Sequence, residues 1–257
     1  PLLFDVAQAV EAVRWCADNG LSGVMLPTMW GEHAAYHDVK YDPFWEACQD
    51  LGIVIHFHSG PAPHSEYFGP AFPNEDRSAE LPGAMGAYVS EVMFWLYRPL
   101  TFMLWGGVFE RFPRLQAMVV EGGTMFMVPS WLMLLDHNYT DIQFSAKLGD
   151  FRSHLSMAPS EYFARNCGIG ASCVPRRDLD LKDQIGLKQI MWGSDFPHPE
   201  GTWPNTEQYY LDTFKGFDAD AGRQILGENA IQFYGMDSDY LNGLASDIGP
   251  SASIFNG

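Results

Sequence analysis

The stretch "GSDFPHPEGTWP", residues 193–204, places Asp195, His198 and Glu200 close together directly after the apolar run Ile190 to Trp192. Carboxylate oxygens and imidazole nitrogens are ligands for zinc, manganese and iron. His198 follows Asp195 closely enough to act as a proton donor, as a partner of a metal ligand or as a ligand of a second metal. The residue types therefore predict a metal site, with an ordinary polar loop as the alternative.

Two other apolar runs end in ligand-type residues in the same way. His58 follows "IVIHF" and Glu121 follows "LQAMVV". We predict that His58, Glu121 and Asp195 hold a divalent metal whose open positions lower the pKa of a bound water. The alternative for Glu121 is a structural role at the N-terminus of the following helix, where an acidic side chain interacts favourably with the helix dipole. His56 shares a strand face with His58 and is a candidate catalytic residue, with a hydrogen-bonded interior histidine as the alternative.

Helical periodicity and short apolar runs alternate along the chain. Asp5 and Asp42 are positioned to cap helices, and Gly20 and Gly52 to end them. The strands are mostly continuous apolar runs, which is typical of parallel strands covered on both faces. They are predicted at residues 23–27, 53–60, 115–120, 167–172 and 188–192. In such folds ligands bind at the carboxyl ends of the strands, where the three predicted metal ligands stand.

The segments around these units also carry expectations. Residues 60–100 are predicted to form a long active-site loop followed by a helix, because long loops at strand exits are usually functional. Two helices are predicted after the last strand, and residues 240–257 are predicted to be a loosely packed C-terminal tail. Trp30 and Trp203 are candidates for walls of the site, with plain packing as the alternative.

Composition narrows the class of protein. The chain of 257 residues has a formal net charge of −17, which repels nucleic acids and anionic membranes. Its four cysteines form no CxxC pair and read as reduced residues, which indicates a cytoplasmic protein. The most apolar region, 84–109, is interrupted by Glu91, Arg98 and Pro99, so no membrane span is expected.

Four motifs occur in order along the chain: "YDPFWEACQDLGIVIHFHSG", "GGVFERFPRLQAMVVEGG", "MWGSDFPHPEGTWP" and "LGENAIQFYG". Together they resemble the amidohydrolase-related family, the branch of the amidohydrolase superfamily that includes aminocarboxymuconate-semialdehyde decarboxylase and resorcylate decarboxylase. The resemblance implies one (β/α)8 barrel domain over residues 1–257, with His58 as the metal ligand of the fifth strand and Asp195 as that of the eighth. Glu121 stands where the decarboxylases carry a sixth-strand histidine.

The resemblance also implies that the five strands are the fourth to the eighth of the barrel. No HxH motif of the family's first strand precedes His56, so the N-terminal strands and their metal ligands are expected upstream of Pro1. An open sheet edge and a partial site would otherwise result.

We therefore expect a metal-dependent hydrolase that acts on a small carbonyl- or carboxylate-bearing molecule through a metal-activated water. Asp195 would hold the metal and take a proton, and His198 or His56 would assist the leaving group. Non-oxidative decarboxylation of a small (aromatic) carboxylic acid is the alternative. There are two further alternatives. One is an oxygenase with a dinuclear manganese or iron centre that Glu121 bridges, and the other is an inactive partner subunit of a related enzyme. The expected cofactor is zinc, or else manganese or iron, and the expected assembly is a homodimer or a complex with a related subunit.

Overall fold

Five parallel strands form the centre of the molecule in this computed structural model, which describes residues 4–28, 30–59, 83–122, 125–141 and 145–256. The strands pair in sequence order, β1-β2-β3-β4-β5. Their bounds are β1 Gly23–Leu26, β2 Val54–Phe57, β3 Ala117–Val119, β4 Cys167–Ser172 and β5 Ile190–Gly193. This confirms the predicted parallel sheet and the α/β class, because sequential parallel strands linked by helices are the arrangement of a (β/α)8 barrel.

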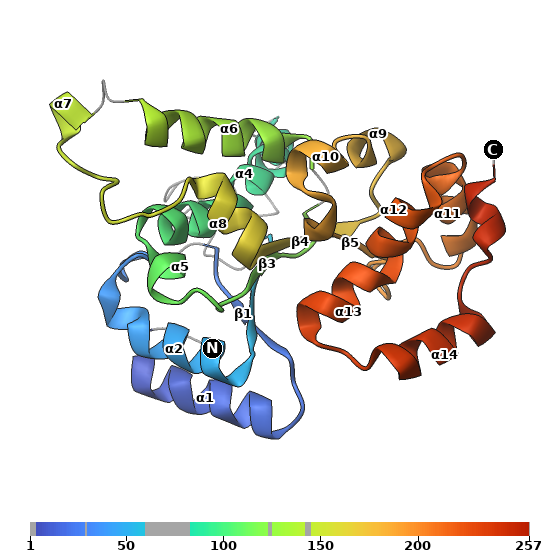
Figure 1. The fold of residues 1–257 in the computed structure, drawn as a ribbon, viewed down its shortest axis with the longest axis horizontal. Helices are drawn as coiled ribbons and strands as arrows, with labels where there is room; N and C mark the ends of the chain where they lie inside the picture. Colours follow the sequence, from blue (N-terminus) through green and yellow to red (C-terminus); the bar gives the residue numbers. More distant parts are fainter. Residues whose placement is uncertain (1–3, 29, 60–82, 123–124, 142–144, 257) are drawn as a thin grey trace.

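The two faces of the sheet are covered by different parts of the chain. Ile55 and Phe57 of β2 point into the main core, which the outer helices cover. Val54 belongs to a second apolar cluster on the opposite face, against which Phe233 and Tyr234 pack. Figure 1 shows α1 and α2 on one side of β1 and α13 on the other. The alternation of side chains along each strand thus separates the two clusters.

The helices begin and end largely where local signals place them. In α1, Val6–Asp18, the Asp5 carboxylate accepts a hydrogen bond from the N–H of Gln8 at 3.0 Å. Gly52 ends α2, Asp42–Leu51, in a left-handed conformation with φ 66°. The capping role predicted for Asp42 is wrong, since its two carboxylate oxygens accept from Arg111 at 2.8 and 2.9 Å.

The other helices form the outer layer and the connections. The helix predicted to follow residues 60–82 is α4, Ala84–Trp105, which contains Pro99. The predicted loop at 60–82 lies outside the described residues. The remaining elements before β5 are η1 Val39–Tyr41, α5 Val108–Arg111, α6 Met127–Thr140, α7 Ser145–Leu148, α8 Pro159–Asn166, α9 Arg176–Leu179, α10 Lys182–Ile185 and η3 Leu187–Gln189.

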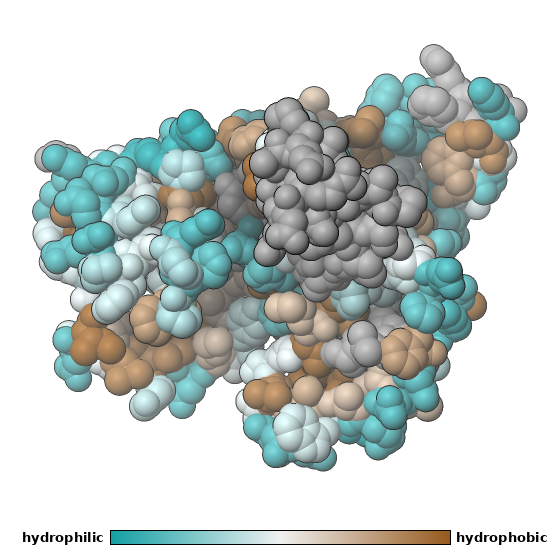
Figure 2. Space-filling view, turned by 180° about the vertical axis from the view of Figure 1, so that it is seen from behind, coloured by the Kyte–Doolittle hydropathy of each residue, from teal (hydrophilic) through white to brown (hydrophobic). Residues whose placement is uncertain are grey.

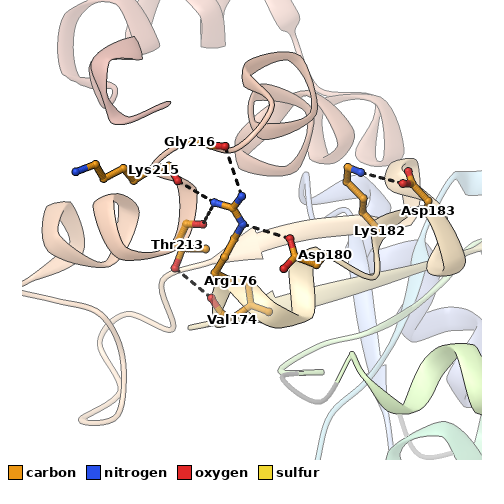
Figure 3. A network of polar contacts seen from close by, with 8 residues as sticks. All are labelled: Val174, Arg176, Asp180, Lys182, Asp183, Thr213, Lys215 and Gly216. Carbon is orange, nitrogen blue, oxygen red and sulfur yellow. Dashed lines mark hydrogen bonds and ion pairs between the residues drawn. The ribbon is translucent and has the colours of Figure 1, made fainter. Parts of the chain in front are cut away.

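The two helices predicted after the last strand are present. The first is α11, Thr206–Phe214, and the second is the continuous run α12 Ala219–Arg223, η4 Gln224–Glu228 and α13 Asn229–Tyr234. Arg176 at the start of α9 contacts the C-terminal end of α11 (Figure 3), where its guanidinium donates to the carbonyl oxygen of Lys215 at 2.9 Å. It also lies over the ring of Phe217 at 4.8 Å.

The C-terminal tail is more ordered than a loosely packed segment. It forms α14, Ser238–Ile248, in which no residue is buried, and η5, Ala252–Phe255. Ile254 is buried in the main core, and the ring of Phe255 packs edge-on against Phe214 at a centroid distance of 6.2 Å. The largely polar composition of the tail did not indicate that Ile254 and Phe255 would pack against the rest of the fold.

The surface shows separate hydrophobic patches among hydrophilic residues when the molecule is seen from behind (Figure 2). Among the residues that the structure describes, no helix is both long and apolar enough to cross a bilayer.

Candidate functional site

Residues that follow three of the five strands share an unusual backbone conformation. Glu121, Cys173 and Asp195 have φ angles of 56°, 49° and 57°, and no other non-glycine residue in the described ranges has a positive φ. They follow β3, β4 and β5, three neighbouring strands. Positive φ is unfavourable for residues with a Cβ and is found preferentially where function requires it. The backbone conformation therefore makes this edge of the sheet a candidate for the functional one.

Two of these residues and His198 bring their side chains together. One ligand atom from each of Glu121, Asp195 and His198 lies within 4.8 Å of the other two. Two donor atoms bound at roughly 2.1 Å from a cation lie at most about 4.2 Å apart. Small side-chain adjustments would therefore suffice for all three to reach one ion, and their donors are of the types that bind divalent metals.

His58, predicted to be a metal ligand, is not one of the three residues of this group but contacts one of them, Glu121. Its Nε2 lies 3.0 Å from the Oε2 of Glu121, and its Nδ1 lies 2.6 Å from the carbonyl oxygen of Ser59. When Nδ1 carries a proton and donates it to that carbonyl, the lone pair of Nε2 is directed toward Glu121, as in metal-binding histidines. The hydroxyl of Ser59 also donates to Oε2 of Glu121, at 3.1 Å. A proton or a cation between Nε2 and Oε2 is needed to make this contact favourable.

The loop after β5 is closed on itself and holds Asp195 and His198. Nδ1 of His198 lies 3.2 Å from Oδ2 of Asp195. The N–H of Thr202 donates to the carbonyl of Ser194 at 2.9 Å, which joins the two ends of the loop. A Cβ on Gly201 would lie 2.7 Å from the carbonyl oxygen of Asp195, so the loop can close this tightly only with glycine there.

His56 lies on the same strand face as His58 but is occupied elsewhere. Its Nε2 is 2.6 Å from the hydroxyl of Tyr234, and the two rings are stacked with an interplanar angle of 8°. Burial lowers the pKa of His56, against the opposing effect of hydrogen bonds to the backbone of Val24 and Val54. The ring therefore connects β2 to α13, as an interior histidine would, and its catalytic role stays a prediction.

Cys173 is a residue of this edge that the sequence analysis did not select. Burial raises the pKa of its thiol, and the nearby carboxylates of Asp195, Glu121 and Glu200 raise it further. It directly follows β4, so the rule that selected His58, Glu121 and Asp195 at other strand exits would have found it as well. Its sulfur is 3.7 Å from the carbonyl oxygen of Glu200.

The two tryptophans considered as walls of the site lie in different surroundings. Trp30 packs edge-on against Tyr36 and Phe102 and carries the guanidinium of Arg98 over its ring at 4.7 Å. Trp203 belongs to the loop after β5, is 67% exposed and contacts the ring of Phe196. Of the two, Trp203 lies on the loop that carries the candidate ligands.

Comparison with known proteins gives a consistent family assignment. The family model described as Amidohydrolase matches residues 1–236. A 2-amino-3-carboxymuconate-6-semialdehyde decarboxylase of Dictyostelium discoideum is 24% identical over 236 residues, which are 89% of this chain and 58% of that protein. The chain thus spans little more than half of this curated relative.

Two solved structures are similar in fold. An amidohydrolase from Mycobacterium avium subsp. paratuberculosis K-10 superposes with a TM-score of 0.69 at 22% identity, over 91% of this chain and 56% of that one. A 5-carboxyvanillate decarboxylase from Novosphingobium aromaticivorans superposes with a TM-score of 0.68 at 19% identity, over 90% of this chain and 62% of that one. The second was solved with manganese and 4-hydroxy-3-methoxy-5-nitrobenzoic acid.

Proposed function

Because the chain belongs to the amidohydrolase family, we propose that it carries the metal site of a divalent-metal-dependent decarboxylase acting on a small carboxylic acid. The observation that carries this proposal is the convergence of Glu121, Asp195 and His198 within 4.8 Å at the carboxyl edge of the sheet. The names of the curated relative and of the manganese-containing neighbour favour decarboxylation over the hydrolysis that the sequence analysis placed first.

The donor set fits a hard or borderline divalent cation. Two carboxylates and one imidazole suit manganese and zinc, whereas a soft monovalent ion would favour sulfur ligands. We assign Asp195 and Glu121 as ligands of the metal. We assign His58 as a third ligand because its Nε2 contacts the carboxylate of Glu121. His198 is either a further ligand or the proton donor, two roles that metal affinity in a His198→Gln variant separates.

The chain's own residues then have distinct tasks. A cation held there would supply positive charge for the substrate carboxylate and an adjacent oxygen. Asp195 orients the ring of His198, whose Nδ1 lies 3.2 Å from its carboxylate, so His198 can present a proton to the carbon that loses CO2. Ser59 holds Glu121 in place through its hydrogen bond of 3.1 Å.

Metal content and product analysis test this proposal. The purified chain is loaded with Mn²⁺, its metal content is measured by mass spectrometry, and it is then incubated with hydroxybenzoic acids and, separately, with lactones. We expect about one Mn²⁺ per chain and release of CO2 from an acid. A chain that binds no divalent metal, or one that opens lactones without releasing CO2 from any acid, would contradict the proposal.

One residue, Glu121, supports two other candidates, which are hydrolysis by a metal-activated water and oxygenation at a dinuclear centre. Glu121 stands where the resemblance implies a histidine in decarboxylases, and its carboxylate contacts His58 on one side while lying near Asp195 and His198. A carboxylate in this position can also bridge two ions. Two Mn²⁺ per chain, together with oxygen consumption, would favour the oxygenase instead.

A further inference from the structure

Two large aromatic side chains stand exposed on the loop that holds the candidate ligands. Phe196 is 64% exposed and Trp203 is 67% exposed. Their rings contact each other edge-to-face, with centroids 5.9 Å apart and an interplanar angle of 78°. Within the described part of the chain, neither ring belongs to either apolar cluster. Packing among the described residues therefore does not account for an aromatic residue at these two positions.

Both rings belong to the loop that carries Asp195 and His198. Phe196 directly follows Asp195, whose left-handed backbone fixes the direction in which the chain leaves the strand. Trp203 directly follows Thr202, which is 1% exposed and whose N–H donates to Ser194, the residue before Asp195. The hydroxyl of Thr202 also lies 3.0 Å from that of Thr206 at the start of α11. Phe196 and Trp203 are thus each next in sequence to a residue whose backbone is held in place, Asp195 and Thr202 respectively.

This placement suits binding better than it suits folding. A rigid loop that presents two aromatic faces loses little conformational freedom when a ligand binds. Aromatic rings prefer offset or edge-to-face contacts with other rings, and such contacts add to the burial of apolar area. Ligand sites combine aromatic walls with a few polar groups that fix orientation. Asp195 and His198 supply polar groups on the same loop.

We propose that Phe196 and Trp203 form an aromatic rim that binds the ring of the substrate and selects an aromatic carboxylic acid over a saturated one. The inference rests on the proposed function, in which the carboxylate of the substrate meets the cation held by Asp195 and Glu121. The rim contacts the remainder of the same molecule. It gives these two exposed residues a role as specificity determinants of the candidate site.

Paired ligands test the rim separately from the metal site. Isothermal titration measures the affinity of the Mn²⁺-loaded chain for 4-hydroxy-3-methoxy-5-nitrobenzoate and for cyclohexanecarboxylate, in the wild type and in Phe196→Leu, Trp203→Leu and the double variant. We expect each single variant to lower the affinity for the aromatic ligand by about fivefold. This is the change that corresponds to the loss of a ring contact of about 1 kcal/mol. Binding of the saturated ligand should change by less than about twofold.

The control is Tyr240→Leu, since Tyr240 is 65% exposed on α14, outside this loop. Titration with Mn²⁺ alone is run on every variant and should give the wild-type affinity. Equal affinity of the rim variants and the wild type for the aromatic ligand, with Mn²⁺ binding intact, would overturn the rim and leave the proposed function standing. A wild type that binds neither Mn²⁺ nor a carboxylate would overturn both.

Discussion

His198 and Asp195 are joined twice within one loop: Nδ1 of His198 lies 3.2 Å from Oδ2 of Asp195, and the N–H of His198 donates to the Asp195 carbonyl at 2.8 Å. The second contact fixes the backbone between them, and the first then fixes the imidazole ring. The carboxylate of Asp195 can therefore orient His198 and contribute to a metal site at the same time. Variants of the two residues should consequently differ in their effects.

Replacement of Asp195 by asparagine should abolish most of the metal affinity. Asp195→Asn keeps the size of the side chain but removes its charge. We expect the Kd for Mn²⁺ to rise at least about 100-fold, because the loss of a residue that only hydrogen-bonds to a metal ligand already costs up to about 100-fold. His198→Gln should raise it by less than about tenfold if His198 is the proton donor. Titration calorimetry with Mn²⁺ measures both.

The matched control for Asp195→Asn is Asp239→Asn, because Asp239 is exposed in the first turn of α14. It should bind Mn²⁺ as the wild type does. An Asp195→Asn variant that retains wild-type affinity would remove Asp195 from the ligand set.

Glu121 should be more important for the metal than the serine that holds it. Glu121→Gln removes the charge near His58, Asp195 and His198, so we expect the affinity for Mn²⁺ to fall by about 10- to 100-fold. Ser59→Ala removes only the hydrogen bond of 3.1 Å to Oε2 and should lower the affinity less. If both variants lose affinity equally, Glu121 acts by positioning other groups. If neither does, the cation is held without it.

The parallel sheet was predictable because each strand is a short apolar run bounded by a turn signal. The same regularity placed His58, Glu121 and Asp195 at one edge, since the carboxyl ends of parallel strands meet there. The backbone conformation at the strand exits was not predictable. The positive φ of Glu121 and of Cys173 depends on how the following chain is held by neighbouring strands, which no local pattern encodes.

Long-range partners explain the other differences. Asp42 has the position of a capping residue, but Arg111 lies 69 residues away in sequence and takes both of its oxygens. Ile254 and Phe255 lie in a stretch rich in small and polar residues, yet they fill a gap beside α11. In each case a tertiary contact outweighs what the local sequence indicates.

Stability should fall with decreasing pH because of His56. Burial lowers its pKa from the ordinary 6.5, so the unfolded chain binds the proton more readily than the folded one. The stabilisation is complete above about pH 6.5 and is lost as the pH falls below that value toward the folded-state pKa. Thermal unfolding at several values between about pH 8 and pH 5 should show a decreasing Tm.

The share of His56 in that decrease is measurable with two variants. His56→Gln should be less stable at neutral pH, with a flatter dependence of Tm on pH, and Tyr234→Phe should keep part of the slope because it leaves the histidine buried. His137→Gln, which changes a side chain that is 63% exposed, is the control and should match the wild type. A wild-type slope retained in His56→Gln would assign the pH dependence to other groups.

Loss of Arg176 should destabilise the C-terminal part of the fold. Its guanidinium donates to the carbonyls of Thr213, Lys215 and Gly216 at 3.4, 2.9 and 3.5 Å, and its Nε lies 3.3 Å from Asp180. Arg176→Ala leaves these carbonyls without their charged donor, so we expect the free energy of unfolding to fall by about 1–3 kcal/mol. Urea denaturation measures this change.

The comparison for Arg176 is Arg14→Ala, which removes a side chain that is 58% exposed and paired with Glu11 within α1. Exposed pairs of this kind contribute about 0.3–0.5 kcal/mol, so the control should change the free energy of unfolding by no more than that. Because Arg176 contacts the chain on both sides of Lys215, its loss should also speed proteolytic cleavage between α11 and α12. A variant as stable and as resistant as Arg14→Ala would show that the carbonyls are satisfied by water instead.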